Sequence, residues 1–194
     1  ALDFFSGQIA FALQNAFLFR REHRKAVELS GLADLTQAIN AIRDPQDLFS
    51  RLVESISPLL DVQIMGFLIF DETRRTLEAK LPFQGIHYAS VVEWYHFVLL
   101  PSSRAEKIWM NAETILAAEA AEDERFSAFA LDHFARMAGI HHSVLVPLTT
   151  SGQMLGYLWA GNKINGEPFD QEDISFLKII SGKAAPIIEN ANLV

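Results

Sequence analysis

Apolar residues recur with a helical period over the first 43 residues of the chain. The positions at alternating steps of four and three are Phe5, Ile9, Ala12, Ala16, Phe19, His23 and Ala26. This spacing is typical of the seam of a coiled coil. After Ser30-Gly31 the stripe continues in a shifted phase, and one helix from Asp3 to Arg43 would be about 60 Å long. The pattern therefore predicts a rod that projects from the domain or pairs with a second rod.

A second amphipathic helix is predicted after Asp44-Pro45, because Asp suits the N-cap and Pro the first helical position. Its apolar face comprises Leu48, Leu52, Ile56 and Leu59, and Pro58 is expected to end it.

Two later stretches have the pattern of β-hairpins. In the first, apolar runs at Ile64–Phe70 and Thr76–Leu81 flank the polar turn Asp71–Arg74. The second hairpin turns at Ser151-Gly152, and Pro147 within its first strand favours an edge or bulge position.

The last predicted strand separates into two faces with a period of two. One face consists of smaller residues suited to packing against a helix, namely Gly156, Leu158 and Ala160. The other face consists of the bulky residues Leu155, Tyr157 and Trp159. The bulky face therefore requires a cover other than that helix.

The segment from residue 85 to 140 has a weaker pattern. The stretches "YASVVEWYHFVLL", "SSRAEKIWMNAE" and "DERFSAFALDHFARMAG" have helical spacing, and "TILAA" favours a short strand. A final helix is predicted to begin at Asp170, with Asp173 completing an arrangement like a capping box, and Pro186 is expected to kink it.

This order of elements predicts an α+β fold. A central antiparallel β-sheet of five to six strands would carry the terminal helices on one face and the mixed helix and loop segment on the other, with the long N-terminal helix in addition.

Composition narrows the function. Half of the 194 residues are apolar, which is sufficient for a sizeable core, and the net charge is −8 with a pI near 5.2. An acidic chain is poorly suited to bind nucleic acid or anionic membrane. No apolar run approaches the ~20 residues of a membrane span, so we expect a cytoplasmic protein, and a first residue other than Met suggests a segment of a longer one.

The chain contains no cysteine, which excludes disulfides, thiolate metal sites and catalytic thiols. We also find no Ser-His-Asp signature, P-loop, dinucleotide-binding glycine motif or HExxH. The sequence therefore predicts that the isolated domain is not an enzyme.

Several stretches, in this order, resemble the GAF domain, a sensory module related in shape to PAS domains. They are "DLFSRLVESI", "IMGFLIFDE", "ERF", "AGIHHSVLVPL", "GQMLGYLWAGNK" and "FDQEDISFL" leading to "IENANL". The resemblance covers roughly residues 30–194 and implies a regulatory domain of a bacterial signalling protein. The covalent bilin attachment and the sulfoxide reductase chemistry known in this family both need cysteine. We therefore expect neither of them in this chain.

The residues Asn162, Lys163, Phe169 and Asp173 resemble a motif of cyclic-nucleotide phosphodiesterase GAF domains. Ile174 replaces the final Glu of that motif, so it does not predict cyclic-nucleotide binding. We interpret Lys163 and Asp173 as a structural pair that joins the last strand to the last helix, worth about 0–1 kcal/mol if partly exposed.

The chain ends much as it begins. Six identities at an offset of 175 positions relate residues 6–18 to residues 181–193, namely Ser6/Ser181, Gly7/Gly182, Ala10/Ala185, Asn15/Asn190, Ala16/Ala191 and Leu18/Leu193. We therefore expect residues 1–29 to be a linker helix that ends a preceding tandem GAF domain, and residues 30–194 to form the second domain.

The resemblance places a ligand pocket between the sheet and the mixed segment. The candidate lining residues are Trp94, Phe97, Trp109, Phe126, Phe134, His142, Tyr157 and Trp159, with His142, Ser143 or Arg125 as polar anchors. Haem ligation by His87, His96, His133 or His142 is less favoured than ordinary hydrogen bonding.

The sequence thus favours a non-enzymatic sensor that binds an unidentified small molecule. Its flanking helices would form a homodimer through Ile9, Ala12, Ala16 and Phe19. The alternative is a degenerate GAF domain that binds no ligand and acts as a dimerisation spacer.

Overall fold

The computed structural model describes residues 47–192. The predicted N-terminal rod with its dimer seam, the boundary at residues 29 and 30, and the cap at Asp44 lie outside the described residues.

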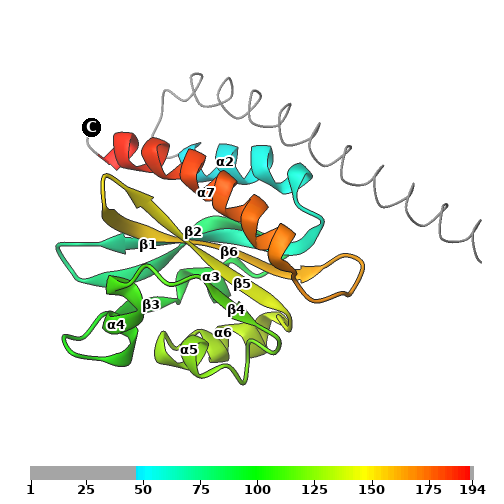
Figure 1. Ribbon diagram of the computed structural model, residues 1–194, viewed down its shortest axis with the longest axis horizontal. Coiled ribbons are helices and arrows are strands. Elements are labelled where there is room, and N and C mark those ends of the chain that lie inside the picture. Colours follow the sequence, from blue (N-terminus) through cyan, green and yellow to red (C-terminus); the bar gives the residue numbers. More distant parts are fainter. Residues whose placement is uncertain (1–46, 193–194) are drawn as a thin grey trace, which may run out of the picture.

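A six-stranded antiparallel sheet forms the centre of the fold (Figure 1). Its strands are β1 (Val62–Asp71), β2 (Thr76–Gln84), β3 (His96–Val98), β4 (Ile115–Ala117), β5 (Ser143–Thr150) and β6 (Gln153–Lys163). The strand order is β3-β2-β1-β6-β5-β4. The long strands β1 and β6 are thus central, and the two three-residue strands form the edges. The predicted α+β architecture is confirmed.

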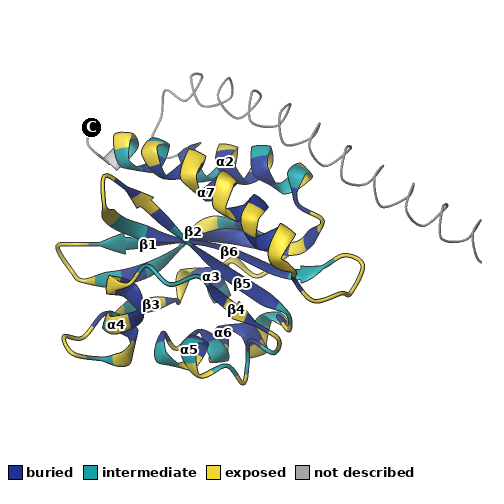
Figure 2. Ribbon diagram, in the orientation of Figure 1, coloured by how far each residue is buried: buried dark blue, intermediate teal, exposed yellow. Residues whose placement is uncertain are grey.

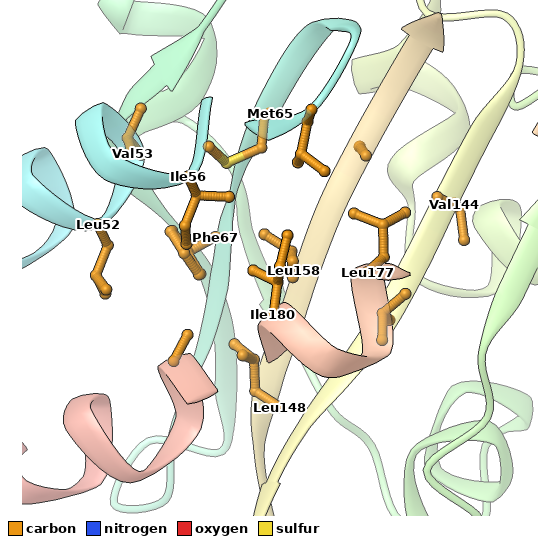
Figure 3. Close-up of a cluster of buried hydrophobic side chains, with 14 of the residues drawn as sticks. Leu52, Val53, Ile56, Met65, Phe67, Val144, Leu148, Leu158, Leu177 and Ile180 are labelled. Carbon is orange, nitrogen blue, oxygen red and sulfur yellow. The ribbon is translucent and has the colours of Figure 1, made fainter. Parts of the chain in front are cut away.

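Two helices cover one face of the sheet, α2 (Leu48–Ile56) and α7 (Gln171–Asn192). The apolar residues of α2 point toward the sheet, and a short 3₁₀ turn, η2 (Ser57–Leu59), follows it and contains Pro58. Figure 3 shows Ile56 of α2, Leu158 of β6 and Ile180 of α7 converging in this core.

Four short helices cover the opposite face of the sheet. The helices are α3 (Ala89–Glu93), α4 (Arg104–Met110), α5 (Glu124–Ala128) and α6 (Leu131–Ala138). Buried residues accordingly lie on both sides of the sheet, and exposed residues lie on the outer sides of the two covering layers (Figure 2).

One predicted helix in this layer is partly wrong. The stretch "YASVVEWYHFVLL" forms only the five residues of α3 as helix, and its second half becomes β3. This second half forms a strand because it pairs with β2, where Phe97 lies opposite Leu77. A helical spacing in the sequence does not reveal that partner.

The two predicted hairpins are confirmed. Asp71 pairs with Thr76 across the first turn, where the Asp71 carboxylate accepts hydrogen bonds from the backbone N–H of Thr73 at 2.8 Å and of Arg74 at 3.1 Å. In the second turn both Ser151 (φ +48°) and Gly152 (φ +81°) have left-handed backbones, as a two-residue turn of type I′ requires.

Pro147 lies where the prediction placed it, on an edge of the sheet. Strand β4 pairs only with residues 143–145 of β5, so the proline has a strand partner on one side only. Its carbonyl oxygen accepts a hydrogen bond from the Ser181 hydroxyl of α7.

A bulge in β6 reverses part of the predicted face pattern. Leu148 pairs with Gly156 and Thr149 with Met154, which leaves Leu155 as the extra residue. Leu158 and Ala160 face α7 as predicted, but Leu155 packs on this face as well, and Met154 packs on the other. The prediction for Leu155 is therefore wrong, because strict alternation cannot continue through a bulge.

Helix α7 begins with the predicted cap. The Asp170 carboxylate accepts hydrogen bonds from the backbone N–H of Glu172 at 2.8 Å and of Asp173 at 2.9 Å, while Asp173 accepts from the Asp170 N–H at 2.9 Å. Pro186 does not end the helix, which continues to Asn192. Among residues 47–192, no helix has the length and apolarity that a bilayer crossing demands.

Candidate functional site

Aromatic side chains fill the layer between the sheet and helices α3–α6. We call this set the aromatic cluster, and its members are Phe70, Phe83, Tyr95, Phe97, Trp109, Phe126, Phe129, Phe134, Tyr157 and Trp159. Each ring centroid lies between 4.7 and 6.0 Å from that of another member. Edge-to-face and tilted pairs at such distances add roughly 0.5–1.5 kcal/mol each beyond the burial of apolar area.

Trp159 of β6 is the centre of one half of the cluster. Its ring lies 5.0 Å from that of Phe134 of α6, 5.7 Å from Phe126 of α5 and 5.9 Å from Phe83 of β2. Its indole Nε1–H donates to the hydroxyl of Ser143 at 2.5 Å, and that hydroxyl donates to the Ala160 carbonyl at 3.2 Å. This half is thus closed and its polar groups are paired.

Tyr157, two residues earlier on β6, is the centre of the other half. Its ring lies 5.9 Å from the rings of Trp109 of α4 and Phe129, which follows α5. The side chain is completely buried, yet its hydroxyl oxygen has no hydrogen-bond partner. Nearby Tyr95, in contrast, donates its hydroxyl hydrogen to the Phe129 carbonyl at 2.9 Å.

The environment of Tyr157 keeps its phenol neutral. Burial, followed by the negative charge of half-buried Glu113, raises the pKa of the Tyr157 hydroxyl well above its ordinary value of 10.0. Burial also raises the pKa of Tyr95 well above that value. Tyr157 therefore presents an uncharged O–H group that can donate one hydrogen bond and accept others.

The three predicted polar anchors, Arg125, Ser143 and His142, are less available than Tyr157. Asp123 holds the Arg125 guanidinium through Nη2 at 2.6 Å and Nε at 3.1 Å, and Nη2 also donates to the Leu116 carbonyl at 2.7 Å. Ser143 is occupied by Trp159. His142 lies immediately before β5, outside the aromatic cluster, with a buried Nδ1 that has no hydrogen-bond partner.

The structure brings six of the eight candidate lining residues into the cluster. These are Phe97, Trp109, Phe126, Phe134, Tyr157 and Trp159. Trp94 lies outside because its side chain is 80% exposed at the end of α3, and His142 lies outside as described. The eight candidates left out four members of the cluster, namely Phe70, Phe83, Tyr95 and Phe129. Phe83 could have been found, because it follows Leu77 and Ala79 at even-numbered intervals along β2.

Three of the four histidines considered for haem lie at the surface, and the fourth is the part-buried His142 described above. His87 and His133 are exposed, and His96 is exposed with its Nδ1 at 3.5 Å from Glu78. Within residues 47–192 no three histidine, aspartate or glutamate side chains are placed to hold a metal ion.

A polar junction lies at the end of β6. The Lys163 ammonium is 2.8 Å from the Asp173 carboxylate, and the exposed fractions of the two side chains are 12% and 6%. The pair thus joins β6 to the first turn of α7, as interpreted from the sequence, but it is more buried than that interpretation assumed.

The comparison with protein-family models identifies one family. A family model described as the GAF domain matches residues 44–188. The comparison with curated proteins returned no match.

Three solved structures illustrate the likeness in fold. The GAF domain from an Acinetobacter phosphoenolpyruvate-protein phosphotransferase has a TM-score of 0.64 at 19% identity, over 86% of this chain and 95% of that chain. The free methionine-R-sulfoxide reductase from Neisseria meningitidis, in complex with its substrate, has 0.63 at 17%, over 87% and 92%. A segment of a methyl-accepting chemotaxis protein has 0.61 at 15%, over 82% and 97%.

Proposed function

The chain belongs to the GAF domain family, and we propose that it is a cytoplasmic, non-enzymatic sensory module of a bacterial signal-transduction protein. It binds a small molecule within the aromatic cluster and passes the signal through its flanking helices. The absence of cysteine supports a role without thiol chemistry.

The observation that carries this proposal is the unpaired hydroxyl of Tyr157. A buried polar group without a hydrogen bond costs about 1–3 kcal/mol, and the hydroxyl of fully buried Tyr157 has no hydrogen-bond partner in the protein. A ligand with one hydrogen-bonding group and an apolar body would satisfy the hydroxyl and replace ring contacts of Trp109 and Phe129.

Two adjacent residues of β6 connect the aromatic cluster to the core beneath α7. Tyr157 faces the aromatic cluster, whereas Leu158, the next residue, packs in the core beneath α7. A ligand that binds two arrangements of α7 with different affinity shifts their populations by that difference and no more.

We further propose that the flanking helices dimerise through Ile9, Ala12, Ala16 and Phe19, and that residues 1–29 end a preceding tandem domain. The repeat supports the second point, since the part of residues 181–193 that the structure describes belongs to α7. Light scattering at micromolar concentration should give the mass of a dimer. A monomer mass would contradict the dimer.

The alternative is a spacer that binds no ligand, and the closed ring contacts around fully buried Trp159 favour it. A thermal-shift screen with the full chain and Tyr157→Phe separates the two functions. A ligand at 100 times its dissociation constant stabilises by about 2.7 kcal/mol, and the variant should lose most of that shift.

Tyr157→Phe also controls for folding. Removing an unpaired hydroxyl should leave the free protein as stable as wild type or more stable by about 1 kcal/mol. If no compound shifts the wild-type melting temperature, or if hits shift both proteins equally, binding at Tyr157 is refuted, and in the first case the spacer is correct.

A further inference from the structure

Asn162, the penultimate residue of β6, has a left-handed backbone conformation, with φ of +51°. Its side-chain oxygen accepts from the backbone N–H of His141 at 2.8 Å, and its side-chain nitrogen donates to the carbonyl of Gly139 at 2.8 Å. Its own N–H donates to the His142 carbonyl at 2.8 Å. These three hydrogen bonds connect Asn162 to the whole turn between α6, whose C-cap is Gly139, and β5. We call this arrangement the clasp.

The helix held by this clasp is part of the aromatic cluster. Phe134 of α6 contacts Trp159 at 5.0 Å, Phe83 at 5.8 Å and Tyr95 at 6.0 Å between ring centroids. Any rearrangement of the cluster that displaces Phe134 therefore moves a short helix whose C-terminal end is tied to Asn162.

The next residue of β6 is tied to the other layer. Lys163 forms the buried ion pair with Asp173, and the same carboxylate oxygen accepts from the backbone N–H of Asp170 at 2.9 Å. Asp170 in turn caps the first turn of α7. A displacement of Lys163 thus acts on the capped end of α7.

We propose that Asn162-Lys163 is a mechanical relay that couples α6 to the N-terminal turn of α7. The two residues are adjacent in the chain, so the backbone of one cannot shift without the other. The left-handed conformation of Asn162 and the burial of Lys163 leave little freedom to absorb such a shift between them. The role of the relay in signalling rests on the proposed function, but the coupling itself is a property of the free protein.

Hydrogen exchange measured by mass spectrometry tests the coupling without a ligand. Asn162→Gly removes both side-chain hydrogen bonds and keeps the left-handed backbone without strain. Ser151→Gly is the matched control, since Ser151 also has a positive φ (+48°) and lies in the turn at the opposite end of β6. We expect Asn162→Gly, and not the control, to accelerate exchange in residues 171–177 roughly three- to tenfold, the equivalent of one hydrogen bond.

The reverse experiment uses Lys163→Met, which keeps an apolar stem and removes the ammonium. Because coupling between two sites is reciprocal, this variant should accelerate exchange in residues 136–142. The relay is refuted if each variant accelerates exchange only in the layer that its own side chain contacts. An equal acceleration in β1, α6 and α7 refutes it as well, because that result indicates general destabilisation. A working relay in a protein that binds no compound would instead refute the sensory function alone.

Discussion

Gly66 in β1 leaves the space that the ring of Phe83, a member of the aromatic cluster, occupies against the sheet. A Cβ atom at this position would lie 2.4 Å from two ring carbons of Phe83 and 2.5 Å from a third, where ordinary contacts are 3.4–4 Å. Phe83 cannot turn aside easily, because it is 4% exposed and its ring packs against those of Phe134 and Trp159. The Gly66→Ala substitution therefore forces a shift of about 1 Å in a closed layer.

The expected cost follows from this geometry. Overpacking of a well-filled core costs about 1–3 kcal/mol. Alanine also restricts the backbone of the unfolded chain more than glycine does, but the stabilisation this gives is smaller than the cost of overpacking. For a domain of this size 1 kcal/mol corresponds to about 2–4 °C in melting temperature. We expect Gly66→Ala to melt about 2–12 °C below wild type.

Thermal unfolding followed by circular dichroism measures this shift and urea unfolding gives the free energies, with Gly182→Ala as the matched control. Gly182 is an exposed position of α7 where a Cβ meets nothing within 4 Å, so alanine there should stabilise by about 0.5–1 kcal/mol. Phe83→Leu completes a double-mutant cycle, in which the smaller side chain should relieve the clash by at least about 1 kcal/mol. Wild-type stability of Gly66→Ala, or additivity within about 0.5 kcal/mol in the cycle, would refute the reasoning.

Three further results are expected. In an alkaline titration followed at 295 nm, Tyr95 and Tyr157 should ionise only as the protein unfolds, because their pKa values are raised above 10.0. Their raised pKa values add stability that is fully present below pH 10 and is lost as the pH rises above it, since only the unfolded chain then releases the protons; ionisation of these two tyrosines near pH 10 in folded protein would contradict this. The Trp94→Phe variant should match wild-type stability within about 0.5 kcal/mol in urea and lose the iodide-quenched part of the fluorescence, and a large destabilisation would show that the exposed side chain packs. The Lys163→Met variant should unfold about 1–3 kcal/mol more easily, because the largely buried Asp173 carboxylate loses the ammonium but keeps the hydrogen bond from the Asp170 N–H; a loss below about 0.5 kcal/mol would show that the pair is effectively solvated.

Elements whose signals are local were predictable from the sequence. The cap of α7 depends on Asp170 and Asp173, which are three residues apart, and the β5–β6 turn depends on Ser151-Gly152. In each case a few neighbouring residues determine the local geometry. The arrangement of helices on one face of the sheet and a mixed layer on the other also followed, because the period of two along β6 separates Leu158 from Trp159.

The contents of the candidate site were decided by contacts between distant segments. β3 emerged from a helical pattern because β2 offered a partner, and the bulge at Leu155 reversed a face that alternation had assigned. Trp94 was excluded from the cluster and Phe83 admitted, although both are aromatic residues near apolar neighbours in the sequence.

The unpaired hydroxyl of Tyr157 and the clasp of Asn162 exist only in three dimensions. Sequence by itself determined which short segments fold as helix, strand or turn, because hydrogen bonds and steric preferences within a few residues fix those choices. Tertiary structure alone decided which rings meet and which polar groups find partners, because these depend on the relative placement of segments that are far apart in the chain.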